Sequence, residues 1–294
     1  MRSLLSPREI ARAVGVSEST LKRWVDAGAV ATTRTPGGHR RIPFAEAVAL
    51  IRRSGVPLRH PAVLGLPEVG ADVVAPGAPG AGDRLYDLLA QDDVAWARGF
   101  VISLYVAGWT LPAIFDGPMR TALTRIGELW RHDGQGIFLE HRATQICLQA
   151  LLQLRGMLPG PPADAPFALG AAPTGDPYLI PSQMAAVIAA DAGLREHNLG
   201  PETPIDALRR AVAHHRPRLV WVAMSTTPDD PRSVAAELGD LALQLEEQGG
   251  VLAVGGRAAA TLGPISAPGL HRLDSMGELA ALARGLRAGA AQRA

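Results

Sequence analysis

The 294-residue sequence has a single cysteine, no long uncharged apolar run and almost no net charge. Because Cys147 is the only cysteine, the chain cannot form an internal disulfide or a metal site built from several cysteines. No charge-free apolar stretch is long enough to span a membrane, and the first residues do not have the pattern of a signal peptide. We therefore expect a cytoplasmic protein without a membrane segment.

The formal charge of +1 conceals a separation of charge along the chain. Residues 1–60 contain 11 Lys and Arg but only 4 Asp and Glu, a formal charge of +7, whereas the remainder carries 18 against 24, or −6. Such a separation favours DNA binding at one end and a near-neutral effector body at the other. The length allows two or three domains.

Two short helices are predicted in the basic segment. Ser6 is a good N-cap, Pro7 suits the first helical position, and Glu9 can reach back to the cap. Ser17 is a second N-cap, and the helix after it runs through Ala27. This spacing predicts a helix-turn-helix. The candidate DNA contacts on the second helix, which project away from its apolar stripe, are Ser19, Lys22 and Arg23.

A basic segment with a glycine pair follows these helices. The glycines permit a tight turn, and the cationic side chains around them suit the binding of phosphate. The candidate contacts here are Arg34, Gly37, Gly38, His39, Arg40 and Arg41. A solvated basic loop is the alternative, but the position directly after a helix-turn-helix favours DNA binding.

Residues 1–57 resemble the DNA-binding domain of MerR-family transcriptional regulators. The resemblance rests on the Arg-Thr-Pro-Gly-Gly-His-Arg-Arg segment and on the helix predicted near Phe44 to Arg53. It implies a winged helix-turn-helix head whose second helix enters the major groove of a double-stranded DNA operator, with the wing beside it.

The rest of the chain is predicted to form a linker and two further domains. Residues 58–82, rich in Pro, Gly, Ala and Val, lack a helical period and should be a linker. Residues 83–158 have the apolar pattern of a four-helix bundle. In residues 166–290 strands alternate with helices, which predicts a doubly wound, Rossmann-like parallel sheet. The predicted strands are 167–172, 195–199, 219–224 and 251–254. The predicted fold class is therefore multidomain, α and α/β.

Trp130 ends a predicted bundle helix, and Glu140-His141 follows after nine intervening residues. Together with the bundle and the α/β domain, this spacing resembles the cobalamin-binding regulators of the CarH, CarA and LitR type, which include photoreceptors. The resemblance implies that Trp130, Glu140 and His141 cap the upper face of the corrin. His132 is a further candidate metal or chromophore ligand, with an exposed helix-end histidine as the alternative.

Four residues of the α/β domain extend this resemblance. They follow the third and fourth predicted strands, at the carboxyl ends where open α/β sheets bind ligands. They are Ser225, Thr226, Gly255 and Gly256. The resemblance implies that such residues approach the buried nucleotide tail of cobalamin, although glycine after a strand is also ordinary turn chemistry.

The loop after the first predicted strand departs from this family. The family's pattern is an acidic residue, any residue, histidine, two residues and glycine; the histidine is the lower cobalt ligand and the glycine leaves room for the displaced base. Here Asp176 keeps the acid, but Tyr178 replaces histidine and Pro181 replaces glycine. A phenol with a pKa of about 10 must lose a proton before it binds a metal, and it offers a hard oxygen. We therefore expect an altered or lost cobalamin response.

Three interpretations of the effector region stay open. It binds cobalamin without the lower histidine, it binds another tetrapyrrole or flat chromophore, or it binds no ligand and serves as an oligomerisation or partner domain. A homo-oligomer, either dimer or tetramer, would raise DNA affinity by presenting paired heads. A cobalamin-dependent enzyme module is the competing class. We do not expect an enzyme, because no substrate domain, nucleophile with its base, phosphate loop or metal cluster is evident.

Overall fold

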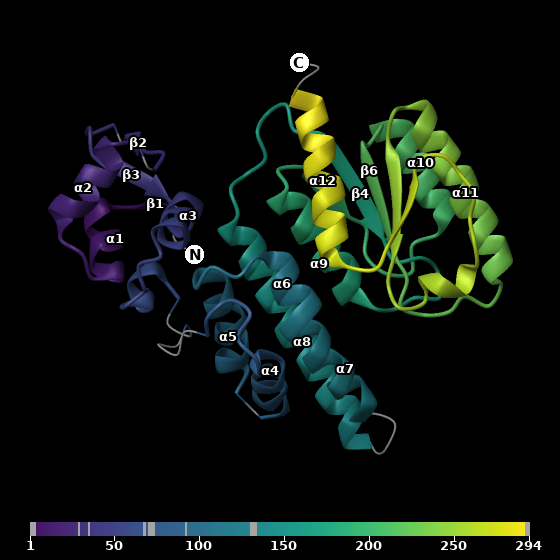
Figure 1. Cartoon of the computed structure of the whole chain (residues 1–294), viewed down its shortest axis with the longest axis horizontal. Helices are drawn as coiled ribbons and strands as arrows, with labels where there is room; N and C mark the ends of the chain where they lie inside the picture. Colours follow the sequence, from purple (N-terminus) through teal and green to yellow (C-terminus); the bar gives the residue numbers. More distant parts are fainter. Residues whose placement is uncertain are drawn as a thin grey trace. The chain divides into compact units, whose positions relative to one another are not determined.

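The computed structural model describes residues 4–28, 30–34, 36–66, 69, 74–91, 93–129 and 134–291. The chain forms two compact units, an amino-terminal unit of residues 1–159 and a carboxy-terminal unit of residues 160–294. The first contains a small three-stranded sheet and many helices, and the second contains a five-stranded sheet covered by helices (Figure 1). The predicted fold class is confirmed.

The amino-terminal unit begins with the predicted helix pair. Helix α1 (Pro7–Val14) and helix α2 (Glu18–Asp26) are separated by a turn in which Gly15 has a φ of +72°. Their apolar sides meet in a core that includes Ile10 and Leu21, both fully buried. The helix-turn-helix prediction is thus confirmed, with the second helix ending one residue earlier than expected.

An antiparallel sheet and a third helix complete this head. Strands β1 (Leu4–Leu5), β2 (Thr33–Arg34) and β3 (Arg40–Pro43) pair in the order β1-β3-β2. Gly38, between β2 and β3, has a φ of +79°, a conformation that glycine adopts without strain. Strand β3 leads directly into α3 (Phe44–Ser54), as the sequence predicted. The β2–β3 hairpin is the wing.

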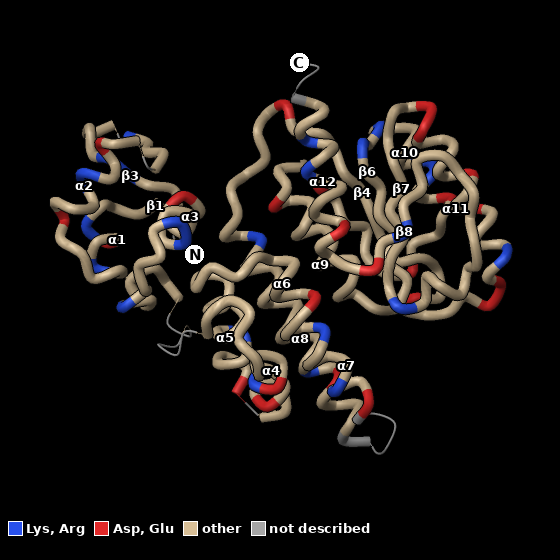
Figure 2. Tube along the Cα trace, viewed as in Figure 1, with Lys and Arg blue, Asp and Glu red and all other residues tan. Residues whose placement is uncertain are grey.

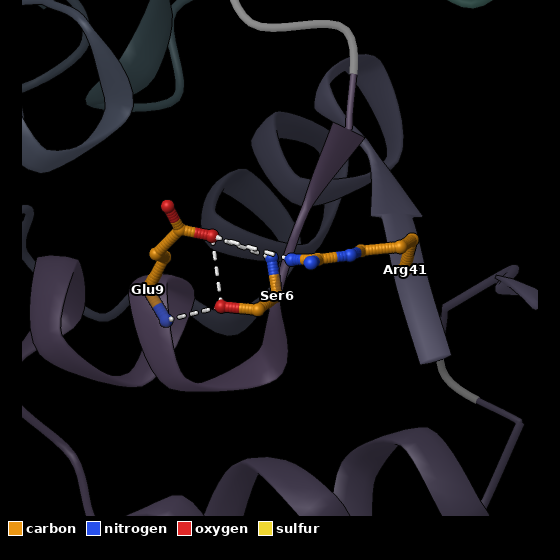
Figure 3. A network of polar contacts seen from close by, with 3 residues as sticks. All are labelled: Ser6, Glu9 and Arg41. Carbon is orange, nitrogen blue, oxygen red and sulfur yellow. Dashed lines mark hydrogen bonds and ion pairs between the residues drawn. The ribbon is translucent and has the colours of Figure 1, made fainter. Parts of the chain in front are cut away.

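The start of α1 is held by reciprocal hydrogen bonds (Figure 3). The Ser6 hydroxyl accepts from the backbone N–H of Glu9 at 3.2 Å, and the Glu9 carboxylate accepts from the backbone N–H of Ser6 at 2.7 Å. The guanidinium of Arg41, on β3, lies 4.0 Å from the same carboxylate oxygen. The predicted capping interaction is confirmed, and it also joins the helix to the wing strand.

Part of the segment predicted as a linker is folded against α1. The backbone N–H groups of Arg59 and His60 donate to the carbonyl of Ala13, at 2.8 and 2.9 Å. A single 3-10 turn follows, η1 (Pro61–Leu64), and the Leu64 side chain is fully buried. Because one short turn has no helical period, the sequence pattern did not reveal it. The linker prediction is therefore wrong for this stretch.

Four helical rods follow, as predicted, and the third is composite. They are α4 (Ala81–Ala90), α5 (Val94–Val106), the run α6 (Leu111–Ile114), η2 (Phe115–Met119) and α7 (Arg120–Leu129), and α8 (Gly134–Met157). Segment η2 is a π-helical turn that contains Pro118, whose missing N–H cannot join a regular ladder. Within the described ranges, no helix has the length and apolar character needed to cross a membrane.

Cys147 lies on α8 in the interior of the amino-terminal unit. Its side chain is buried, and this burial raises the pKa of the thiol to about 12. The thiol is therefore protonated at neutral pH. It packs as a small apolar group.

The carboxy-terminal unit is a doubly wound α/β domain. Its strands are β4 (Phe167–Ala171), β5 (Arg195–Asn198), β6 (Leu219–Ala223), β7 (Val251–Gly255) and β8 (Leu270–Leu273). All neighbours run parallel in the order β5-β4-β6-β7-β8. The winding reverses between β4 and β6, so the carboxyl ends of these two strands mark the topological switch point.

Helices cover both faces of this sheet (Figure 1). They are α9 (Leu179–Asp191), α10 (Ile205–His215), α11 (Pro231–Glu247) and α12 (Met276–Ala291), with a 3-10 turn η3 (Ala259–Leu262). Helices α10 and α11 share an apolar core with Val220 and Val222 of β6. Helix α9 packs against β4 and β6 on the opposite face, and α12 packs against α9.

Two features of this unit differ from the prediction. Strand β8 was not predicted, because none of its four residues is fully buried and its side chains show neither an apolar run nor alternation. Helix α9 begins at Leu179, whereas the apolar pattern of the sequence predicts a helix only over residues 183–192. Pro181 lies in the first turn of α9, where a missing N–H removes no intrahelical hydrogen bond.

We predict that Ser6→Ala destabilises the amino-terminal unit by about 1 kcal/mol, because the Glu9 N–H loses its acceptor. Denaturant unfolding of the full-length protein, followed by far-ultraviolet circular dichroism, measures this loss. Ser266→Ala, in an exposed loop of the other unit, is the control and should leave the transition unchanged. Equal midpoints for Ser6→Ala and wild type would contradict a stabilising cap.

Candidate functional site

The candidate DNA contacts lie on α2 and on the wing. Those on α2 are all exposed: Ser19, Lys22 and Arg23. On the wing four are exposed, Arg34, Gly37, Gly38 and His39, and two are half-buried, Arg40 and Arg41. Figure 2 shows the Lys and Arg positions of this head along α2, β3 and α3. The fold thus brings the two predicted sets of contacts into one small domain.

The two half-buried wing arginines are paired with carboxylates. The Arg40 guanidinium forms an ion pair and a hydrogen bond with Asp26, at the end of α2, and Arg41 lies close to Glu9. The hydrogen bond from Arg40 is the main cause that holds the pKa of Asp26 below its ordinary value. The sequence pattern predicted both arginines only as contacts to phosphate. Their acidic partners are distant in sequence, so local motifs did not reveal them.

Other cations of the head remain available. Within the described part of the chain, the side chains of Arg23 and Arg34 form no hydrogen bond or ion pair. Lys22 is exposed, and its charge also lowers the pKa of Asp26. A polyanion therefore meets Arg23 and Arg34 without competition, whereas Arg40 must first exchange its carboxylate partner.

The structure covers only part of the predicted upper ligand site. Trp130 and His132 lie outside the described residues. Glu140 and His141 lie on α8, with the imidazole Nε2 3.5 Å from the Glu140 carboxylate. Glu140 also accepts a hydrogen bond from the Thr144 hydroxyl at 3.2 Å. Both side chains are accessible to solvent, so this pair keeps the capacity to contact a ligand.

In the carboxy-terminal unit, Asp176 connects the loops that follow β4 and β6. Its side chain is 1% exposed. One carboxylate oxygen accepts from the backbone N–H groups of Ser225 and Thr226, and the other accepts from the N–H of Tyr178 at 3.1 Å. The fold therefore brings these predicted site residues together, and the carboxylate itself is the group that joins them.

Tyr178 has a cationic neighbour that the sequence analysis did not identify. The guanidinium carbon of Arg257 lies 5.0 Å from the centre of the Tyr178 ring. Arg257 also donates from Nε to the Ser225 carbonyl at 2.7 Å. Its position directly after Gly255-Gly256 is the only sequence signal that could have drawn attention to it. The phenol ring thus stacks with protein at the position where the family places its metal ligand.

Packing of the backbone accounts for Gly255 and Gly256. Gly256 has a φ of +104°, and a Cβ there would lie 2.2 Å from the carbonyl oxygen of Met224. A Cβ at Gly255 would lie 2.9 Å from the Leu273 carbonyl oxygen. No side chain fits at either position, whether or not a ligand is bound.

Trp221, on β6, is a buried residue that the sequence analysis did not select. Its side chain is 2% exposed, and a Cβ at Gly170 on β4 would lie 2.1 Å from its ring. The indole N–H donates to the hydroxyl of Ser182, in the first turns of α9, at 3.0 Å. The only sequence signal was an aromatic residue within a continuous apolar strand.

The residues present do not fit a histidine-ligated cobalamin with its base displaced. The loop after β4 offers the phenol of Tyr178, and the carboxylate of Asp176 already accepts backbone N–H groups. The rigid ring of Pro181 takes the position of the family's glycine. The space behind it, between the sheet and α9, holds the indole of Trp221.

Comparison with known proteins supports a two-part organisation. Residues 4–54 match the helix-turn-helix domain family. Among curated proteins, no sequence matches the chain. The monomethylamine corrinoid protein of Methanosarcina barkeri is similar in structure, with 16% identity, 70% of this chain and 98% of that chain covered, and a TM-score of 0.52. A cobalamin-binding protein from Desulfitobacterium hafniense DCB-2 shares 16% identity over 70% of this chain and 97% of its own, with a TM-score of 0.33.

The first of these structural similarities shows a shared fold. The chain therefore combines an amino-terminal helix-turn-helix DNA-binding domain with a body that has the fold of a corrinoid protein.

We predict that Asp176→Asn destabilises the carboxy-terminal unit by about 2 kcal/mol, because an amide nitrogen would face a backbone N–H donor. Thermal unfolding of the full-length protein measures the change. Asp164→Asn is the matched control, since Asp164 pairs at the surface with Arg287 and such pairs contribute at most about 1 kcal/mol. A variant as stable as wild type would show that the carboxylate does not hold the two loops.

A second prediction concerns the ion pair of Asp26 with Arg40. Because the pKa of Asp26 is lowered, the pair persists to more acidic pH than an ordinary carboxylate allows, and it is lost as pH falls through this lowered pKa. At neutral pH, Asp26→Asn should free Arg40 and tighten binding to duplex DNA by about twofold to fivefold. The effect should shrink at high salt, because exposed charges are screened.

Fluorescence anisotropy with a labelled duplex, from 50 mM salt upward, measures this change. Asp87→Asn is the control, since Asp87 is an exposed acid on α4. Unchanged affinity of Asp26→Asn at low salt would contradict the release of Arg40 to DNA.

Proposed function

We propose that the protein is a DNA-binding transcriptional regulator of the MerR type that acts on a double-stranded operator. The observation that carries the proposal is a helix-turn-helix with a basic wing, in which the exposed guanidinium groups of Arg23, on α2, and Arg34, on the wing, pair with no described residue. The formal charge of +7 over residues 1–60 supports it, because phosphate contacts supply a large share of DNA affinity.

In this proposal α2 lies in the major groove and the wing lies along the adjacent phosphates. Lys22 and Arg23 face the groove from α2, where they reach base edges and backbone oxygens. Arg34 binds phosphate from the wing. Arg40 exchanges the carboxylate of Asp26 for a phosphate, so its contribution is smaller than that of an unpaired arginine.

The effector half of the proposal is an altered or lost response to cobalamin. It is supported by Tyr178 and Pro181 in the loop after β4 and by the use of Asp176 as a backbone acceptor. A corrinoid bound without a lower histidine is compatible with these residues. Another tetrapyrrole is the alternative, supported by the accessible imidazole of His141 beside Glu140. The third interpretation has no ligand and an oligomeric body.

We further propose that the body forms a homo-oligomer, a dimer or a tetramer, which presents paired heads to neighbouring half-sites. Linked heads bind with a high effective concentration, so a change of oligomeric state changes DNA affinity. Stoichiometric binding of adenosylcobalamin together with loss of a tetramer in light would overturn the proposed loss of response. Analytical ultracentrifugation in darkness and after illumination distinguishes the two cases.

Catalysis is not part of the proposed function. The competing proposal is a cobalamin-dependent enzyme module. Turnover of any methyl donor or mutase substrate by the full-length protein with added cobalamin would favour the enzyme.

We predict that Arg34→Ala weakens binding to DNA by roughly fivefold to tenfold near 0.1 M salt and reduces the salt slope by about one. Arg40→Ala and Arg41→Ala should also weaken binding, but Arg40→Ala by less than Arg34→Ala. The probe is a duplex selected by the full-length protein from a randomised pool, and affinity is measured by anisotropy between 50 and 200 mM salt.

Arg232→Ala removes one exposed cation from the other unit and is the charge-matched control. If Arg34→Ala and Arg232→Ala change DNA affinity equally, the wing does not contact the operator. Absence of any selected duplex at low salt would refute DNA binding itself.

A further inference from the structure

The indole of Trp221 occupies the face of the sheet that α9 covers. Side chains alternate along a strand, so Val220 and Val222 face the core with α10 and α11 while Trp221 points to the opposite face. On that face the two residues paired with Trp221 are small, Gly170 on β4 and Ala253 on β7, as are Ala168 and Ala223, while Leu219 of β6 is a large apolar neighbour. One large ring therefore fills a space that its neighbours leave open.

The Trp221 ring packs so closely against Gly170 that no residue with a side chain fits at position 170. The two residues are register partners on β6 and β4. A Cβ on Gly170 would lie 2.1 Å from two carbons of the indole, far inside van der Waals contact. Gly170 has no positive φ that would itself demand glycine. Its lack of a side chain is therefore explained by the indole alone.

Polar groups fix the ring in this position. The indole N–H donates to the Ser182 hydroxyl at 3.0 Å, and that hydroxyl donates to the side-chain carbonyl of Asn198 at 2.7 Å. Asn198 also donates to Gln183 at 3.1 Å and accepts from the Gly200 N–H at 3.1 Å. The buried indole N–H is thus satisfied within the protein, and the ring has no unpaired polar atom.

The hydrogen-bond network of Trp221 includes Ser182, which is next to a position at which the chain differs from the cobalamin-binding pattern. Ser182 directly follows Pro181, which stands where that pattern has the glycine that makes room for a displaced base. The indole N–H reaches this first part of α9 from β6. Indole and benzimidazole are fused bicyclic rings of nearly equal size, although indole has one nitrogen in the five-membered ring and benzimidazole has two. The chain therefore places its own heteroaromatic ring beside the loop that would accept such a base.

We propose that Trp221 is a built-in occupant of the base site, which excludes the benzimidazole-type base of a corrinoid from the carboxy-terminal unit. This inference rests on the proposed effector role of that unit and selects between its interpretations, because a corrinoid can then bind only with its base outside the sheet–α9 space. Tyr178 replaces the histidine that would ligate cobalt, whereas Trp221 fills the space between the sheet and α9 that would hold the base. The two changes exclude the same binding mode through independent physical causes.

The first test uses the wild-type, full-length protein and two corrinoids. Cobalamin carries the nucleotide tail and cobinamide lacks it, and absorption spectra report whether the base has left the cobalt. We expect no base-off spectrum and affinities for the two compounds within about threefold of each other, including equal absence of binding. A base-off spectrum with cobalamin bound at least about tenfold more tightly than cobinamide would overturn the proposal.

The second test opens the space. Trp221→Ala should lower the melting temperature of the carboxy-terminal unit by roughly 10 °C, and millimolar benzimidazole or indole should restore part of that loss. Wild type should show no such shift, and neither should Trp96→Ala, which removes an exposed tryptophan from the other unit. Trp221→Phe, which keeps a ring, should remain folded and respond less than Trp221→Ala.

A folded Trp221→Ala whose melting temperature ignores both compounds would contradict the proposal. If Trp221→Ala does not fold, the spectra of wild type with the two corrinoids still decide the question. DNA binding by wild type is measured in parallel. If the wild-type protein does not bind DNA, the proposed regulator is refuted. If it binds DNA and also gives a base-off spectrum with cobalamin, only the role of Trp221 is refuted.

Discussion

A buried carboxylate that accepts three backbone N–H groups fixes the edge of the α/β unit at which ligands would bind. Asp176 draws together the loops after β4 and β6, and each buried N–H left without an acceptor would cost about 1 to 3 kcal/mol. The geometry of this edge is therefore set by the chain before any ligand arrives. The space between the sheet and α9 is likewise filled by the protein itself, because the Trp221 side chain occupies it.

In the head, part of the positive charge is paired with carboxylates. The formal excess of cations there suggests a uniformly basic surface, yet Arg40 and Arg41 are neutralised by Asp26 and Glu9. Glu9 also caps α1, so the wing and the first helix share one carboxylate. Shape and charge are thus coupled in this domain. The same contacts that orient the wing reduce its attraction for distant phosphates.

Local patterns predicted most of the fold, because caps, helical periods and the apolar run at 219–224 act over a few residues. Strand β8 was missed because an exposed edge strand carries no such pattern. The site was less predictable. An apolar run buried on both faces does not reveal which face each side chain serves, so the role of Trp221 was hidden. Its contact with Gly170 depends on the register of β4 against β6, and the pairing of Arg40 with Asp26 depends on tertiary folding.

The contact between Gly170 and the Trp221 ring also constrains the order in which this domain could change by mutation. While the indole is present, any side chain at position 170 collides with it, so Gly170 cannot be replaced first. Shrinking Trp221 first is sterically allowed, but it leaves a void and removes the indole N–H that donates to the Ser182 hydroxyl. Either single substitution therefore passes through a less stable protein, so an open sheet face requires both positions to change.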